Sequence, residues 1–174
     1  NEVQETLTGT QKGTVLHLCM QKLEIGKEYN IEEIKELINN LKEREIITKL
    51  EAESVNINAI LKFTKSRIWK ELKNAKEIHR EESFYMTIPA KEIYNKELDE
   101  KIVVQGIIDL YYINSNNDLI LLDYKTDYVQ SEEELVQKYN SQLELYKKAL
   151  ESSLNRKVDK IYIYSTYLGK EIEI

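Results

Sequence analysis

The sequence is poor in cysteine, proline and glycine, and the lack of cysteine excludes several kinds of protein. Among 174 residues there are one cysteine, one proline and five glycines. A single thiol, Cys19, cannot form an internal disulfide framework, a zinc site built from cysteines or a four-cysteine iron–sulfur cluster. Charged residues of both signs are interspersed and make up 32% of the chain, which is typical of a soluble globular domain. We expect the protein to reside in the cytoplasm, which is a reducing compartment.

Long apolar runs and an excess of positive charge are also missing. No run reaches the length of a transmembrane helix and no signal peptide is visible, so no membrane partner is expected. The net charge is −6, whereas a free-standing protein that binds DNA tightly is normally basic. An enzyme whose acidic site holds metal while neighbouring domains hold the nucleic acid is compatible with this charge. The length suits a single domain, residues 1–174, and the chain lacks an initiator methionine, as a piece of a longer protein would.

The most informative stretch is a pair of apolar runs that each contain one aspartate. The runs Val103–Ile113 and Leu119–Thr126 are rich in Val, Ile, Leu and Tyr, which favours strands covered on both faces. Between them lie five turn-favouring residues, a length that suits a hairpin. The pattern therefore predicts two adjacent antiparallel strands.

Asp109 and Asp123 lie opposite each other if this hairpin closes in its simplest register, with Ile113 facing Leu119. Opposed strand residues have Cβ atoms roughly 4.5–5.5 Å apart, and like charges at this spacing are destabilising. A divalent cation removes that penalty. Lys125 shares the face of Asp123 because side chains alternate along a strand. Taken alone, Asp123 and Lys125 fit a structural ion pair equally well, but the opposed Asp109 favours a hydrolytic metal site.

The combination of two carboxylates and one ammonium fits the hydrolysis of phosphodiesters. Hard oxygen ligands on adjacent strands suit Mg²⁺, with Mn²⁺ as the alternative. Such an ion lowers the pKa of a bound water and offsets the charge of the transition state. Lys125 would orient the attacking water or stabilise the developing anion.

Other polar residues have both a functional and a structural interpretation. His17, on the first expected helix, is either a packed core residue or a metal ligand. Gln142 and Tyr146 share one helix face, where they either contact DNA or pack on the sheet. Glu81 is an extra acidic ligand, an ion-pair partner of Arg80 or a solvated charge. The lysines near Trp69 form either a phosphate-binding stripe with a stacking aromatic or an ordinary solvated face with Trp69 at the edge of the core.

The order of the elements predicts an α/β sandwich around a mixed sheet, with a mainly helical part at residues 1–79 that carries His17 and a sheet core at residues 80–174. One helix is expected from Gly13-Thr14 to about Leu23, a second near Ile31–Arg44 with a capping box at Asn30 and Glu33, and one or two shorter helices within Thr48–Glu77. Strands are expected at Glu81–Thr87, over the two aspartate runs, and at Val158–Thr166 and Glu171–Ile174, with a helix from an N-cap at Ser131 to about Ser152.

The chain resembles the RecB-type nucleases of the PD-(D/E)xK superfamily, with their restriction-endonuclease-like core. More closely, it is similar to the C-terminal nuclease domains of AddA-type chains in AddAB (RexAB) helicase–nucleases. The matching segments follow the family's order over nearly the whole chain: Gly13–His17, Arg80–Phe84, Gly106–Asp109, Asp123–Thr126, and Gln142 with Tyr146. One departure is Ser83, where the family often has proline.

The resemblance implies a role for each matching residue. The metal would be bound by His17, Asp109, Asp123 and the backbone carbonyl of Tyr124. The catalytic lysine would be Lys125. The remaining matches would support the site or contact DNA: Gln142, Tyr146 and Glu81.

The resemblance also implies an activity and partners. The activity would be Mg²⁺-dependent exonucleolytic cleavage of single-stranded DNA, on the 3′-terminated strand, in double-strand-break repair and recombination. The partners would be the helicase domains of a longer parent chain and a second protein of the AddB (RexB) type. No Walker A motif is present, so no nucleotide is expected to bind to this piece. A non-catalytic module that guides DNA and a stand-alone nuclease of a mobile element are the alternative interpretations.

Overall fold

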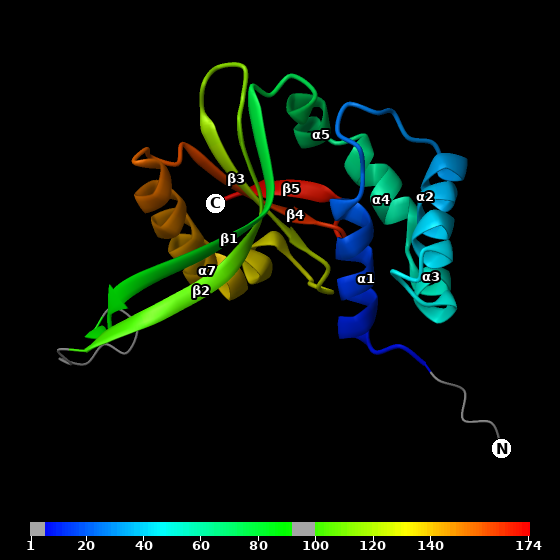
Figure 1. Ribbon diagram of the computed structural model, residues 1–174, viewed down its shortest axis with the longest axis horizontal. Coiled ribbons are helices and arrows are strands. Elements are labelled where there is room, and N and C mark those ends of the chain that lie inside the picture. The colour runs from blue at the N-terminus through cyan, green and yellow to red at the C-terminus, as the bar shows by residue number, and fades with distance from the viewer. Residues whose placement is uncertain (1–5, 92–99) are drawn as a thin grey trace.

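The computed structural model describes residues 6–91 and 100–174 (Figure 1). Within these residues a sheet with the strand order β1-β2-β3-β4-β5 lies between two layers of helices. The bounds of the strands are β1 (Glu77–Pro89), β2 (Lys101–Ile113), β3 (Leu119–Lys125), β4 (Lys160–Ser165) and β5 (Lys170–Glu173). Only β3 and β4 pair in parallel, and the chain between them contains α7 (Glu132–Leu154). The sheet is therefore mixed, as the sequence predicts.

Five helices with bounds in the described part of the chain lie on the opposite side of the sheet from α7 (Figure 1). They are α1 (Gly9–Gln21), α2 (Ile31–Glu43), α3 (Lys49–Ser54), α4 (Ile57–Thr64) and α5 (Arg67–Leu72). β3 shows how both layers are held. Ile120 and Leu122 belong to the core shared with the N-terminal helices, whereas Leu119 and Leu121 belong to the core shared with α7. Burial on both faces explains why this run is continuously apolar.

Most of the elements expected from the sequence are confirmed, and the differences have local causes. The capping box of Asn30 and Glu33 begins α2, and Ser131 caps α7. α1 does not begin at Gly13 but at Gly9, because Thr8 and Gln11 form a capping box one turn earlier. The segment 48–77 holds three short helices rather than one or two, and β1 begins at residue 77 rather than 81.

Gly13 lies inside α1 because of a close approach and not because a helix begins there. A Cβ atom at this position would lie 2.4 Å from Oγ1 of Thr126, which follows β3. The glycine therefore allows α1 to pack directly against the end of the strand that carries Asp123. This contact places α1, and with it His17, beside the sheet.

Trp69 does not stack on a surface ligand. Its side chain is 1% exposed, and its Nε1 donates a hydrogen bond to the carbonyl of Lys27 at 3.3 Å. Phe63 packs edge-on against it at 5.3 Å between ring centroids. The interpretation of this tryptophan as a stacking aromatic is wrong, because the helical layer is thick enough to bury it.

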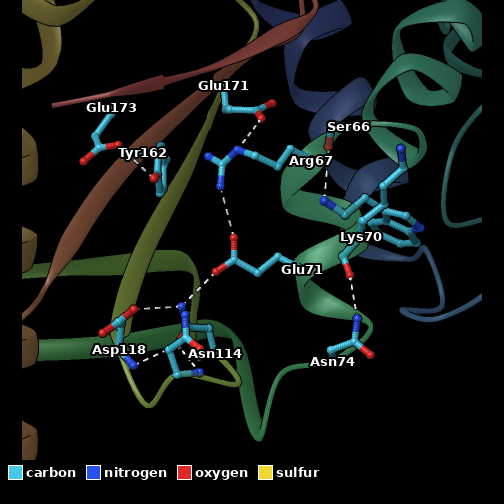
Figure 2. A network of polar contacts seen from close by, with 12 residues as sticks. Ser66, Arg67, Lys70, Glu71, Asn74, Asn114, Asp118, Tyr162, Glu171 and Glu173 are labelled. Carbon is cyan, nitrogen blue, oxygen red and sulfur yellow. Dashed lines mark hydrogen bonds and ion pairs between the residues drawn. The ribbon is translucent and has the colours of Figure 1, made fainter.

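A network of polar contacts fixes the turn between β2 and β3 to α5 (Figure 2). Arg67 donates hydrogen bonds to Glu171 of β5 at 3.1 Å and to Glu71 at 3.2 Å. Glu71 in turn accepts a hydrogen bond from Nδ2 of Asn114 at 2.9 Å. The Asn114 side-chain oxygen accepts from the backbone N–H of Asp118 at 2.8 Å, which closes the turn. The hairpin that carries both aspartates is thus held at its closed end.

The register of this hairpin follows the prediction up to the aspartates. Ile113 pairs with Leu119, and the ladder continues to Leu110 and Leu122. Asp109 and Asp123 are the next positions on the two strands. The ladder ends just before them, so their carboxylates meet other partners.

Candidate metal and catalytic site

Three side chains from three elements converge at the end of the hairpin ladder. His17 comes from α1, Glu81 from β1 and Asp109 from β2. One ligand atom of each lies within 4.8 Å of the others, with His17 Nε2 at 3.3 Å from Asp109 Oδ1 and 4.0 Å from Glu81 Oε1. An imidazole nitrogen and two carboxylate oxygens form a donor set that suits a divalent cation.

The backbone at Glu81 turns its side chain toward this point. Glu81 has φ of 54°, in the left-handed region that non-glycine residues seldom adopt. It lies opposite Asp109, between the pairs Arg80–Leu110 and Glu82–Ile108. A strained residue at the centre of a long strand is uncommon outside functional sites. The sequence marks Glu81 as a candidate acid but gives no sign of this conformation.

Two polar atoms of the cluster are buried with few or no hydrogen-bond partners. Among the described residues, Glu81 Oε1 has no hydrogen-bond partner, and His17 Nε2 faces only the acidic oxygens of Asp109 and Glu81, at 3.3 and 4.0 Å. Buried polar atoms are nearly always paired, and an unpaired one needs an explanation such as an ion. These residues therefore fit a bound cation by their chemistry as well as by their spacing.

The second oxygen of Asp109 has a fixed structural partner. Its Oδ2 accepts a hydrogen bond from the backbone N–H of Tyr124 at 2.8 Å. The ring of Tyr124 is buried and packs edge-on against His17, at 5.5 Å between centroids. Tyr124 thus orients two of the candidate ligands. The binding of a metal by its backbone carbonyl stays a prediction.

Asp123 and Lys125 form a buried pair next to the cluster. Asp123 is 2% exposed, and its Oδ2 lies 2.7 Å from Lys125 Nζ. Asp123 does not belong to the group of three converging ligands, but its charge interacts with those of Asp109 and His17 as well as with Lys125. The sequence places these two residues on one face, and their contact agrees with that.

α7 supplies the support for Lys125. Gln142 Oε1 accepts a hydrogen bond from Lys125 Nζ at 2.8 Å, and Gln142 Nε2 donates to the hydroxyl of Tyr146 at 3.0 Å. The ring of Tyr139 lies 4.0 Å from the ammonium, in a cation–π contact. Gln142 therefore contacts the site directly, whereas Tyr146 packs on the sheet against Phe84, at 5.4 Å between ring centroids, and reaches Lys125 only through Gln142. Sequence reasoning missed Tyr139, although it shares this helix face, three residues before Gln142.

Electrostatics in the cluster favour the binding of protons or cations. Burial and the charge of Asp109 raise the pKa of Asp123, against the opposing effect of Lys125. Burial and Asp109 likewise raise the pKa of Glu81. Burial alone would lower the pKa of His17, but the contact with Asp109 and the nearby acidic charges outweigh it and raise the pKa. Part of each shift comes from neighbouring negative charge, which a metal ion would offset.

A groove of about 580 Å³ opens beside the cluster. One wall is the N-terminal half of α1, including Thr14 and His17. The other wall is the end of β3 and the segment that follows, with Lys125 and Tyr128, closed by Tyr139 of α7. The groove therefore gives a ligand access to both His17 and Lys125.

Within the described residues, no helix is long and apolar enough to cross a membrane.

Comparisons with known proteins match this chain to one family model and to several related proteins. The family model of the PD-(D/E)XK nuclease superfamily matches residues 2–172. A protein of Thermoanaerobacter sp. (strain X514), named as a subunit of an ATP-dependent helicase/nuclease, is 41% identical over 99% of this chain and 14% of its own length. Proteins of the same name from Clostridium kluyveri (strain ATCC 8527 / DSM 555 / NBRC 12016 / NCIMB 10680 / K1) and Clostridium novyi (strain NT) are 43% and 39% identical, over 91% and 99% of the chain. The chain spans about a seventh of the length of these relatives.

Proposed function

Because the chain belongs to the PD-(D/E)XK nuclease superfamily, we propose that it hydrolyses phosphodiester bonds of single-stranded DNA with a bound divalent metal ion. The ion that we propose is Mg²⁺. The observation that carries this proposal is the convergence of His17, Glu81 and Asp109 on one point, with the Asp123–Lys125 pair beside it. The metal would be held by His17 and Asp109, with Glu81 and Asp123 as further acidic ligands. When bound, it would supply an activated water and charge to stabilise the transition state.

The protein's own residues have separate roles in this proposal. Asp109 and His17 hold the ion between the sheet and α1. Lys125 donates hydrogen bonds to the phosphate oxygen on which charge develops, or to the attacking water. Gln142 is a positioning residue, because it touches Lys125 and leaves the cluster of acids untouched.

The relatives suggest the setting in which this activity is used. They are named as ATP-dependent helicase/nuclease subunits, and this chain matches only a small part of each. We propose that the chain is the nuclease part of a larger helicase–nuclease that acts as an exonuclease in repair and recombination. The helicase domains and a partner protein of the AddB type would deliver the strand, which is consistent with the net charge of −6.

The test is the cleavage of a labelled single-stranded oligonucleotide with Mg²⁺ or Mn²⁺. Native protein is expected to cut, whereas Asp123→Ala and Lys125→Ala are expected to lose cleavage. Lys49→Ala is the matched control for the lysine variant, because Lys49 lies in α3 with its side chain 83% exposed. DNA binding without any metal binding, measured by calorimetry, would contradict the proposal and favour a non-catalytic guiding module.

A further inference from the structure

Two exposed tyrosines form an aromatic pair beside the groove. Tyr128 is 71% exposed and Tyr167 is 50% exposed, and their ring centroids lie 4.5 Å apart with the planes tilted by 57°. Tyr128 lines the groove that also contains His17 and Lys125. Tyr128 follows β3, whereas Tyr167 lies in the turn between β4 and β5. The pair is therefore built from two loops that meet at the mouth of the candidate site.

Backbone contacts fix the turn that carries Tyr167 to the strand that carries Lys125. The carbonyl of Lys125 accepts hydrogen bonds from the backbone N–H and the hydroxyl of Thr166, at 2.9 and 3.3 Å. In the turn that follows, Ser165 accepts hydrogen bonds from the N–H groups of Leu168 and Gly169 at 3.1 and 2.8 Å. Gly169 has φ of +70°, which closes this tight turn without strain. Tyr167 is thus anchored next to Lys125, and the contact between the two rings joins Tyr128 to it.

The folding of the chain does not account for this exposure. Among the described side chains, neither tyrosine belongs to the two hydrophobic cores or packs against them. The nearest acidic side chain along the loop, Asp127, is already bound by Lys138 and by the hydroxyl of Tyr139. An aromatic surface with its local negative charge neutralised suits a flat ligand that carries phosphates.

We propose that Tyr128 and Tyr167 form a platform on which an unpaired base of the substrate stacks, while the strand continues along the groove to Lys125. This inference rests on the proposed function, because it assigns a substrate contact to the same site. Stacking on tyrosine is tolerant of sequence, since every base has an aromatic face. A base inside a duplex has both faces covered by its neighbours, so the platform selects single strands and frayed ends.

The short loop keeps the stacked base near the reacting phosphate. Tyr128 lies three positions after Lys125, so their Cα atoms are at most about 10 Å apart. The stacked base therefore lies a few nucleotides from the phosphate at Lys125.

The test measures the binding of a short single strand that carries one 2-aminopurine, in EDTA so that no cleavage occurs. Native protein is expected to quench the fluorescence of the probe on binding. The double variant Tyr128→Ala/Tyr167→Ala is expected to lose the quenching and to bind about tenfold more weakly, because stacking contributes at this scale. The double variant to Phe keeps both rings and should keep both properties.

Tyr85→Ala is the matched control, since Tyr85 is 75% exposed but lies on β1 and does not line the groove. Its binding and quenching should equal those of native protein. Unchanged quenching in the double alanine variant, or equal losses in Tyr85→Ala, would overturn the platform. A native protein that binds no single strand would overturn it as well.

Failure of the platform and failure of the proposed function have different signatures. If native and double-variant proteins cut and bind DNA equally well, the nuclease assignment stands and the platform is wrong. If native protein binds with quenching that depends on the two rings but never cuts with any divalent ion, the platform stands and the nuclease assignment is wrong.

Discussion

The carboxylate of Asp109 accepts a hydrogen bond from the backbone N–H of Tyr124 at 2.8 Å, and its other oxygen lies 3.3 Å from His17 Nε2. One side chain therefore joins β2 to β3 and also faces the candidate ion. Its two oxygens have different roles, one in the fold and one in binding, and suitable substitutions separate them.

Asp109→Asn and Asp109→Ala should differ in stability but not in metal binding. The asparagine carbonyl can still accept the hydrogen bond from Tyr124, whereas alanine leaves that buried N–H unpaired. We expect the free energy of unfolding of Asp109→Ala, measured by urea titration, to be about 1–3 kcal/mol lower than that of Asp109→Asn. Both should lose calorimetric Mn²⁺ binding, because neither keeps the charge. Equal stability of the two variants would show that the hydrogen bond contributes little.

The stability of the metal-free protein should fall as the pH rises from about 5 to 8. The pKa values of Asp123, Glu81 and His17 are all raised in the fold, so the native state holds more protons than the unfolded chain in this range. Stability then decreases with pH, because the slope follows the protons bound by the unfolded state minus those bound by the native state.

Urea titrations in EDTA at several pH values measure this slope. Asp123→Asn should make it shallower, because it removes one of the titrating groups. Saturating Mn²⁺ should raise the stability most at the high end of the range, where the ligands are deprotonated. A metal-free protein that is more stable at pH 8 than at pH 6 would contradict the electrostatic description of the cluster.

Gly13→Ala and Gly9→Ala should have opposite effects, although both lie in α1. Alanine gains up to about 1 kcal/mol over glycine inside a helix. At Gly9 nothing lies within 4 Å of the new Cβ, so Gly9→Ala should be neutral or stabilising. At Gly13 the Cβ would lie 2.4 Å from Thr126 Oγ1, so Gly13→Ala should destabilise the protein and weaken cleavage by shifting His17.

The double variant Gly13→Ala/Thr126→Ala tests the cause directly. If the clash with the threonine hydroxyl is responsible, removing that side chain should restore most of the stability lost in Gly13→Ala. Thermal unfolding of the native protein, Gly13→Ala, Thr126→Ala and the double variant provides the comparison. If the stability is not recovered, the destabilisation by Gly13→Ala has another cause within α1.

Gln142→Ala should lower kcat and leave the metal affinity nearly unchanged. Gln142 touches Lys125 and Tyr146 but not the converging acids and His17. Loss of a side chain that orients a reacting group typically costs 10–100-fold, so we expect a decrease of roughly that size. Single-turnover cleavage with calorimetry of Mn²⁺ binding separates the two quantities. A matching loss of metal affinity would show that Gln142 acts on the ion as well.

The hairpin was predictable from the sequence because its signals are local. Five turn residues and two apolar runs fix the pairing of Ile113 with Leu119, and the alternation of side chains then places Asp123 and Lys125 together. Counting along the two strands predicts which residues face each other only as far as the strands stay paired. The ladder ends before Asp109, whose carboxylate bonds to the backbone of Tyr124 instead of facing Asp123 alone.

Contacts between distant elements were not predictable in the same way. No periodicity in the sequence indicates which helix packs on the end of β3, so the approach of His17 follows from family resemblance and not from its own neighbours. The left-handed backbone of Glu81 and the meeting of Tyr128 with Tyr167 are likewise products of tertiary packing. Trp69 shows the same limit, because the sequence leaves open whether its side chain is exposed, whereas packing against Phe63 and a hydrogen bond to the carbonyl of Lys27 bury it.

The candidate site draws on α1, β1, β2, β3 and α7, which together extend from His17 to Tyr146 along the chain. During synthesis on the ribosome, His17 emerges long before the strands that hold the acids, and the support for Lys125 emerges last. A nascent or truncated chain that ends before α7 has acids and a histidine but no positioned ammonium. The distribution of the site over the chain thus makes α7 a requirement for its completion, because Gln142 of α7 bonds to Lys125.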